Sequence, residues 1–239
     1  MRDIKQLHPQ LQLKIAELQL LCKKKGLNIG IGECLRTVAE QDALYAQGRT
    51  KPGLKVTNAR GSTYSSQHQW GLACDFYRND GKGAFYDSDG FFTKVGKLAK
   101  SIGLGWGGDW KSPVDKPHLY LPQWGSTTSA LRSAYGTPDK FMRTWDNTIL
   151  NYKIGGTYRT TKPCYLRLSP AGKKLDYKDA PDYIKAKSTK QSGKVSFKKG
   201  ATFVLMEVAE KNGNYWGRMK TGYWVPLRYK SALRAIICK

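Results

Sequence analysis

Two short stretches of this 239-residue chain place histidines beside carboxylates. Residues 66–75 read Ser66-Gln67-His68-Gln69-Trp70-Gly71-Leu72-Ala73-Cys74-Asp75, and residues 115–118 read Asp115-Lys116-Pro117-His118. Apolar residues are interspersed among polar ones over 70–77, which predicts a strand that carries Asp75, and a second strand is expected over 118–121. His68 then lies in the loop before the first strand. The two strands can bring all three side chains to one place.

This residue set matches the ligands of a catalytic zinc site. Such sites commonly use two histidines and one carboxylate and leave one position for water, and His68, Asp75 and His118 would supply that set. Asp115 would remain as a carboxylate that takes a proton from the bound water and delivers it to a leaving amine. The alternative is ordinary hydrogen-bonded His–Asp pairs. Cys74 is expected to face the core, because neighbouring residues of a strand point in opposite directions.

The segments around these stretches predict an α+β unit, an antiparallel sheet with helices. Apolar residues three and four apart predict a helix over 7–25, with His8 at its entry. Thr37 and Glu40 have the spacing of a capping box, which predicts a helix from there to about residue 47. A further helix is expected over 91–102, a short strand over 27–31, and loops over 51–66, 79–90 and 103–108.

Beyond a predicted linker at 146–156, the sequence takes on the character of an all-β unit. Strands are expected over 157–159, 164–167, 202–208, 215–219 and 223–225. Asn212-Gly213 lies between two of these runs and predicts a hairpin turn. Residues 171–193 are rich in lysine and interrupted by proline, which predicts a long loop.

The net charge is the strongest global feature of the sequence. The formal charge is +23, and 20 basic against 5 acidic residues lie after position 150. A surface with this charge attracts polyanions such as nucleic acid, anionic lipid or an anionic cell-wall polymer. The simpler interpretation is that the charge keeps the protein soluble.

The remaining composition points to a folded protein made in a reducing compartment. The five cysteines are odd in number and widely spaced, which argues against a disulfide framework. No stretch approaches the roughly 20 apolar residues of a membrane-spanning helix. The first residues lack the basic start and apolar run of a secretory signal, so another protein is expected to provide the way out of the cell.

The motif residues resemble a known enzyme family. The pattern Ser66-x-His68-x-x-Gly71-x-Ala73-x-Asp75, followed by Asp115-x-x-His118, is similar to the zinc D-Ala-D-Ala carboxypeptidases and L-Ala-D-Glu endopeptidases, a group that includes VanX, VanY and several phage endolysins. The likeness covers about residues 7–123. Upstream it takes in these residues: Glu33-Cys34-Leu35-Arg36-Thr37, Gln41, Leu44, Tyr45, Gly48, Arg49 and Thr50.

The resemblance implies a role for each site residue. His68, Asp75 and His118 correspond to the zinc ligands, Asp115 to the catalytic acid/base, and Arg36 to the arginine that steadies the scissile carbonyl oxygen. Many members have glutamate in place of Asp115, and the aspartate is similar to the endopeptidase branch. Leu119-Tyr120 also departs from the aromatic and acidic residues that often follow the second histidine.

The last part of the chain resembles a bacterial SH3-like cell-wall-binding domain. The likeness is carried by residues 200–208, 212–219 and 222–225. It implies a small barrel. Trp216 and Trp224 are expected to pack in its core rather than to bind the wall.

The sequence therefore predicts a phage-type endolysin with a zinc peptidase domain at 1–145, a linker at 146–156 and a wall-binding domain at 157–239. The expected cofactor is Zn2+, and the expected reaction is cleavage of the L-Ala-D-Glu bond of peptidoglycan. The expected partners are peptidoglycan and anionic wall polymer, without nucleic acid or stable membrane insertion. The protein would be made in the host cytoplasm and act at the wall after release through a membrane pore.

Two alternatives stay open at this point. One is a D,D- or L,D-carboxypeptidase of the same fold. The other is a non-catalytic protein that binds the cell wall or another polyanion and holds a structural zinc.

Overall fold

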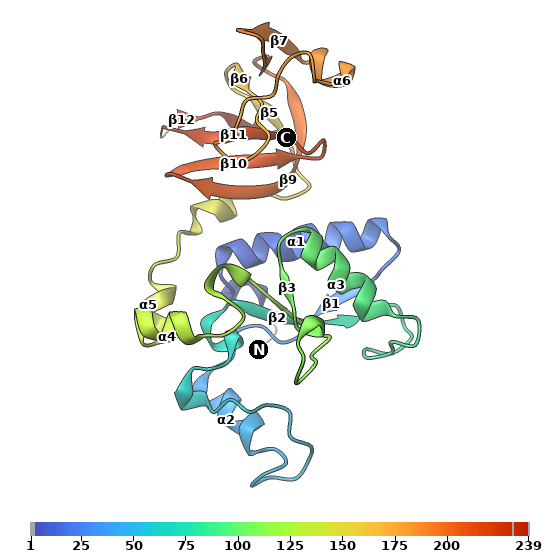
Figure 1. Cartoon of the computed structure of the whole chain (residues 1–239), viewed down its shortest axis with the longest axis vertical. Helices are drawn as coiled ribbons and strands as arrows, with labels where there is room; N and C mark the ends of the chain where they lie inside the picture. The colour runs from blue at the N-terminus through green and yellow to red at the C-terminus, as the bar shows by residue number, and fades with distance from the viewer. Residues whose placement is uncertain (1–2, 231, 239) are drawn as a thin grey trace. The chain divides into compact units, whose positions relative to one another are not determined.

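The computed structural model describes residues 3–230 and 232–238. The chain divides into two units, Met1–Asp146 and Asn147–Lys239, which are described separately (Figure 1). None of the helices in the described part of the chain combines the length and apolar character that a membrane crossing requires.

The first unit is built on a four-stranded antiparallel sheet. Its strand order is β1 (Ile29–Ile31), β2 (Ala73–Arg78), β4 (His118–Tyr120) and β3 (Gly105–Trp106). The register of the two central strands sets Asp75 opposite His118. The expected antiparallel sheet with helices is confirmed for this unit.

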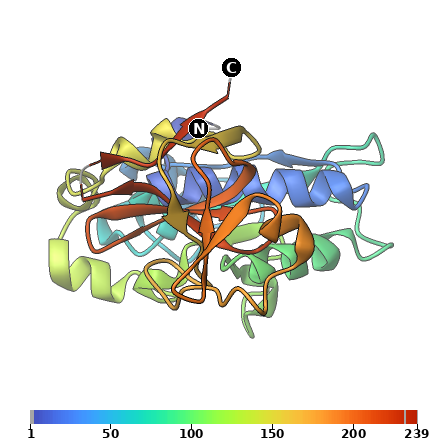
Figure 2. The ribbon, with the colours of Figure 1, turned by 90° about the horizontal axis from the view of Figure 1, so that it is seen from above.

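Helices α1 (Pro9–Lys24) and α3 (Phe91–Ser101) provide much of the apolar core beside this sheet. α1, drawn in blue, is seen along its length in Figure 2. It begins at His8, whose Nδ1 accepts a hydrogen bond from the backbone N–H of Gln10. Leu11, Ile15 and Leu18 recur on one face of α1 and are buried, as their spacing predicts.

The segment before β2 differs from the sequence-based expectation. A strand was expected from Trp70, but Gln67–Trp70 form a 3-10 helix that ends at Gly71 in the left-handed conformation, with φ 64°. β2 starts only at Ala73. The 3-10 turn, rather than an open loop, therefore presents His68.

Helix α2 (Val38–Ala46) has the capping box that the sequence predicts. The Thr37 side chain accepts a hydrogen bond from the Glu40 backbone N–H, and the Glu40 carboxylate accepts one from the Thr37 backbone. Two short helices, α4 (Ser129–Tyr135) and α5 (Pro138–Met142), follow later and were not expected.

The second unit contains two antiparallel sheets. The six-stranded sheet has the order β12 (Ala232–Leu233), β11 (Trp224–Tyr229), β10 (Asn214–Met219), β9 (Thr202–Lys211), β5 (Thr157–Thr160) and β13 (Ala235–Ile237). The three-stranded sheet has the order β6 (Cys164–Tyr165), β8 (Lys194–Phe197) and β7 (Ser188–Gln191). Within 147–230 and 232–238 these strands form no closed barrel.

Several details of this unit follow the sequence and one does not. Asn212-Gly213 forms the turn between β9 and β10 as expected, with positive φ at both residues. Trp216 and Trp224 are buried, in agreement with a packing role. The expected long loop over 171–193 is wrong in part, because it contains helix α6 (Asp182–Lys185) and strand β7.

Candidate metal centre

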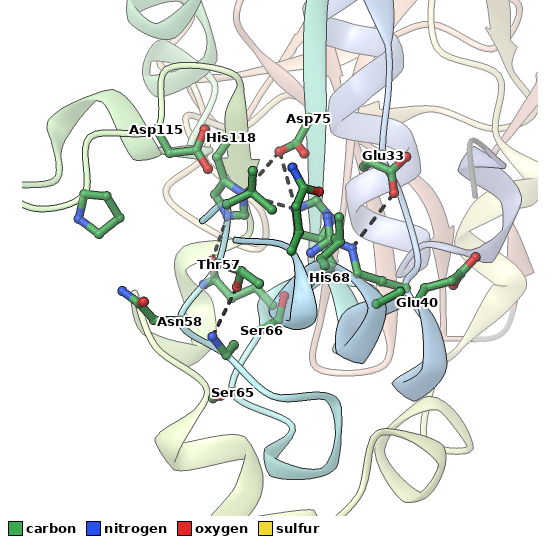
Figure 3. Close-up of a pocket in the computed structure, with 18 of the residues that line it drawn as sticks. Glu33, Glu40, Thr57, Asn58, Ser65, Ser66, His68, Asp75, Asp115 and His118 are labelled. Carbon is green, nitrogen blue, oxygen red and sulfur yellow. Dashed lines mark hydrogen bonds and ion pairs between the residues drawn. The ribbon is translucent and has the colours of Figure 1, made fainter. Parts of the chain in front are cut away.

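Three elements bring the proposed ligands together in one cleft. His68 comes from the 3-10 helix before β2, Asp75 from β2 itself, and His118 from the neighbouring position on β4. Figure 3 shows the three side chains pointing toward one another, with Asp115 beside His118. Both histidines are buried, at 4% and 5% exposure. The sheet register thus assembles residues that are far apart in the sequence.

The three facing atoms form a nearly equilateral triangle. His68 Nε2 lies 3.2 Å from His118 Nδ1 and 3.4 Å from Asp75 Oδ1, and the remaining side measures 3.3 Å. Ligands held 2.0–2.1 Å from a tetrahedral zinc lie about 3.3 Å from one another. The spacing therefore fits a small tetrahedral cation.

The hydrogen bonds behind the imidazoles show which atoms face the centre as acceptors. His68 Nδ1 lies 2.8 Å from the backbone oxygen of Cys34, and His118 Nε2 lies 3.0 Å from Gln67 Oε1. Because these oxygens only accept, each outer nitrogen carries the proton and each inner nitrogen presents a lone pair.

The carboxylate completes this set of inward-facing acceptors. Asp75 Oδ1 is buried and receives no hydrogen bond. Burial opposes its ionisation, but the attraction that His68 and His118 exert whenever they carry an inward-facing proton outweighs burial and holds the pKa of Asp75 below its ordinary value. For His118, burial lowers the pKa and favours the neutral ring. Three facing acceptors without a proton between them are unfavourable unless a cation lies among them, so the residues fit a metal.

Asp115 lines the same cleft but stands outside the triangle. The backbone N–H of Asp115 donates a hydrogen bond to the Gly107 carbonyl. A Cβ at position 107 would come 2.5 Å from the backbone oxygen of Asp115, so this close approach requires glycine there. Burial, followed by the charge of Asp75, raises the pKa of Asp115. Asp115 is therefore the carboxyl group of the cleft best suited to exchange a proton.

Arg36 also lines the cleft. Its Nη1 donates to Gln41 Oε1 at 2.9 Å, and its backbone N–H donates to the His68 carbonyl at 3.2 Å. The Gln41 amide in turn donates to the Ala59 carbonyl and to the Thr57 hydroxyl. The backbone of Arg36 is thus tied to the peptide that carries His68, while Gln41 holds the guanidinium. The guanidinium Nε is buried, makes no hydrogen bond and lies 3.9 Å from a carboxylate oxygen of Glu33.

The cleft is large enough for an extended peptide, with a volume of about 1160 Å³. Its walls combine apolar side chains such as Val56 and Phe85 with polar residues. The polar residues include Asn58 and Ser65, which Figure 3 labels. Gln67 and Gln41, whose amide side chains contact His118 and Arg36, had no role predicted from the sequence. Gln67 lies inside the quoted motif, but an uncharged amide there has no spacing that would reveal its role.

Cys74 does not take part in the centre. It is fully buried in the apolar core, and burial raises the pKa of its thiol. The expectation that it faces away from Asp75 is confirmed.

Comparison with known proteins agrees with this geometry. Residues 60–121, which contain His68, Asp75, Asp115 and His118, match a family described as D-alanyl-D-alanine carboxypeptidase. The peptidoglycan L-alanyl-D-glutamate endopeptidase CwlK of Bacillus subtilis is 40% identical over 124 residues, which cover 48% of this chain and 73% of that protein. The chain belongs to the peptidase family of CwlK. The resemblance of the first part of the chain to the peptidases is thereby confirmed, whereas the SH3-like resemblance of the last part stays a prediction.

Two other proteins are similar to the chain. The L-alanyl-D-glutamate peptidase of Listeria phage A118 is 32% identical over 119 residues, which cover 48% of this chain and 38% of that protein. The solved structure of Serratia marcescens L-Ala D-Glu endopeptidase ChiX has a TM-score of 0.37 and 19% identity. That match covers 49% of this chain and 82% of the other.

Proposed function

We propose that this protein is a peptidoglycan hydrolase that cleaves the L-Ala-D-Glu bond of the stem peptide. The observation that carries the proposal is the triangle formed by His68, Asp75 and His118 in a cleft wide enough for a peptide. The choice of bond follows the relatives, because CwlK is an L-alanyl-D-glutamate endopeptidase and the phage A118 protein is an L-alanyl-D-glutamate peptidase.

Zinc is the metal proposed for the centre. His68 Nε2, His118 Nδ1 and Asp75 Oδ1 would hold it, and two imidazoles with one carboxylate are a common donor set of catalytic zinc. When bound, zinc supplies a Lewis acid that polarises the scissile carbonyl and lowers the pKa of a bound water. The three side chains leave one face open to the cleft, where the substrate would enter.

Asp115 is proposed as the acid/base of the reaction. Its carboxylate would take a proton from the attacking water and pass that proton to the nitrogen that leaves as an amine. A raised pKa suits this second step, because a more basic carboxylate holds the proton until the amide bond breaks.

Arg36 is proposed to stabilise the negative charge that develops on the carbonyl oxygen. A fixed cation at such a position is worth a few kcal/mol. Gln41 holds the guanidinium by one amino group, which pre-orders it before the substrate arrives.

Digestion of purified peptidoglycan, followed by mass spectrometry, tests the bond and the metal together. We expect new amino groups on D-Glu in the absence of a chelator and none in its presence. Release of free D-alanine would instead support the carboxypeptidase alternative, which the description of the matching family favours. Absence of any cleavage by the zinc-loaded protein would contradict both.

The second unit is proposed to be an SH3-like module that holds the enzyme on anionic wall polymer. Residues after position 150 include 20 basic and only 5 acidic ones. A groove of about 280 Å³ in this unit has Lys187 and Lys220 in its lining, together with Tyr183. Tyr183 is 57% exposed. Cations around an aromatic side chain suit an anionic, partly apolar polymer.

Two variants separate the enzyme from a non-catalytic wall-binding protein. His68→Ala and Asp115→Asn should each abolish wall lysis, while sedimentation with purified walls should still detect binding. Unchanged lysis by both variants would overturn the catalytic assignment.

A further inference from the structure

We infer that Gln67 is a positioning residue: it fixes the proton of His118 on Nε2 and so turns the Nδ1 lone pair toward the metal. The inference rests on the proposed zinc centre and deepens it. Gln67 directly precedes His68 in the 3-10 helix and is 7% exposed. One turn of helix would thus supply a ligand and the partner of another ligand.

The orientation of the Gln67 amide follows from its second neighbour. Gln67 Nε2 lies 3.4 Å from the Gly125 carbonyl oxygen. A carbonyl accepts hydrogen bonds and donates none, so the NH2 group of the amide must face Gly125. The amide oxygen is left to face His118, which it does at 3.0 Å.

The orientation of the amide then determines the tautomer of His118. Gln67 Oε1 can only accept, so His118 Nε2 must carry the ring proton, and a neutral imidazole has only one. Nδ1 is therefore unprotonated, and it faces Asp75 Oδ1 at 3.3 Å and His68 Nε2 at 3.2 Å. The Gly125 carbonyl, just beyond β4, thereby orients the Gln67 amide, and the amide leaves the Nδ1 lone pair of His118 free for the metal.

Packing keeps the ring in this orientation. The His118 ring centroid lies 4.9 Å from that of Trp110 and 5.9 Å from that of Tyr120. The other histidine depends on a different kind of partner, because His68 donates to a backbone oxygen that no substitution removes. Gln67 is thus the side chain whose replacement tests how ligand orientation contributes to metal binding.

The nearby Gln69 offers a matched control. It belongs to the same 3-10 helix, is 3% exposed and donates from its Nε2 to the Gly61 carbonyl at 2.8 Å. It touches neither imidazole in the hydrogen bonds of the described residues. Gln67→Met and Gln69→Met remove the same amide from the same short helix, but only the first removes a ligand's partner.

Zinc affinity, measured by competition with a chromogenic chelator, is the first readout. We expect Gln67→Met to bind zinc about 10- to 100-fold more weakly than the unmodified protein, the range typical for loss of a ligand's hydrogen-bond partner. Gln69→Met should bind zinc as the unmodified protein does. Gln67→Glu keeps an acceptor for His118 Nε2–H and should retain most of the affinity. Equal affinities for Gln67→Met and Gln69→Met would overturn the inference.

A second measurement uses the unmodified full-length chain and does not depend on how the variants fold. Long-range 1H–15N correlation spectra report which imidazole nitrogen carries the proton. We expect Nε2–H for His118 in the zinc-loaded protein, and a proton on Nδ1 would overturn the inference. If the unmodified protein binds no zinc, the proposed metal centre itself fails, which is a different outcome from equal affinities of the variants.

Discussion

Asp115 lies in the cleft outside the triangle of proposed ligands, and its proposed task is to move a proton. Asp115→Asn keeps the size of the side chain but removes its basicity. We expect hydrolysis of a soluble peptidoglycan fragment to fall by about 10²- to 10⁴-fold, the usual contribution of such a group. Zinc content, measured by elemental analysis, should not change, because Asp115 is not one of the three proposed ligands.

The matched control for this substitution is Asp109→Asn. Asp109 is an exposed carboxylate in the neighbouring segment, where it pairs with Lys100 at 2.8 Å. Its loss should leave the rate almost unchanged, since an exposed ion pair contributes little. A similar rate for Asp115→Asn and Asp109→Asn would show that Asp115 does not act in the proton transfer.

The side chains of the candidate metal centre could be predicted from the sequence, but the amides that support them could not. His68 and His118 are two of only three histidines in the chain, both lie near aspartates, and strand pairing explains how His118 meets Asp75. Gln67 acts through a hydrogen bond that exists only after β4 and the loop at Gly125 have folded against it. Such contacts depend on tertiary structure and leave no periodic pattern in the sequence.

At the level of elements, Gly71 is the junction between the turn that bears His68 and strand β2. Its φ is 64°, and a Cβ added there would lie 2.8 Å from Trp145 Cη2. We expect Gly71→Ala to destabilise the first unit by at least the roughly 1–2 kcal/mol of the left-handed conformation. Urea-induced unfolding measures the loss.

Gly103→Ala separates the cost of the left-handed backbone from the cost of the contact with Trp145. Gly103 has φ 86°, and an added Cβ would meet no atom within 4 Å. The Gly103 variant should therefore lose less stability than the Gly71 variant. Equal losses would mean that the Trp145 contact has no influence on this junction.

His8 at the start of α1 predicts a pH dependence of stability. Burial lowers its pKa from 6.5 to about 4. Between pH 6.5 and about 4, His8 is therefore protonated in the unfolded chain but neutral in the folded one. The free energy of unfolding keeps its full His8 contribution above pH 6.5 and decreases as the pH falls toward 4. The full shift corresponds to at most about 3.4 kcal/mol of unfolding free energy.

Thermal unfolding of the His8→Asn variant tests this dependence. Asparagine can still accept the hydrogen bond of the helix start, but it does not titrate in this range. We expect a shallower loss of stability between pH 6.5 and 4 in the variant, although the ring contacts with Trp124 and Trp145 are lost at every pH. Parallel pH profiles for the two proteins would contradict the assignment.

Elements with strong periodicity or clear caps were predicted well, and the shortest ones were not. α1 and α2 have apolar spacing or a capping box, and both formed as expected. β3 has two residues and exists only because it pairs with β4. Strand β7 was missed within the lysine-rich segment, although the turn that follows it, Ser192-Gly193, has positive φ at both residues and is a recognisable hairpin signal.

At the scale of the whole molecule, charge should control attachment to the wall more than catalysis. Attraction between the basic second unit and an anionic polymer is screened within about 10 Å at 0.1 M salt. We expect sedimentation with purified walls to show weaker binding as NaCl rises from about 0.05 M to 0.5 M. The hydrolysis of a small soluble fragment should change little over the same range.

Walls stripped of their anionic polymers provide the control for this experiment. They should bind the full-length protein weakly at every salt concentration. Salt-independent binding to both wall preparations would show that recognition is not electrostatic, and the lysines of the second unit would then have another purpose.

The alternation of side chains along β2 decides which donor atoms face the proposed metal centre, and the donor atoms influence which metal ions bind there. Asp75 and Cys74 are adjacent, yet only the carboxylate faces the two imidazoles, while the sulfur lies in the apolar core. Thiolates attract soft ions such as Cu(I), whereas two nitrogens and one oxygen do not give that preference. Pairing with β1 and β4 fixes the register of β2, and a one-residue slip would exchange the carboxylate for the thiol at the proposed metal centre.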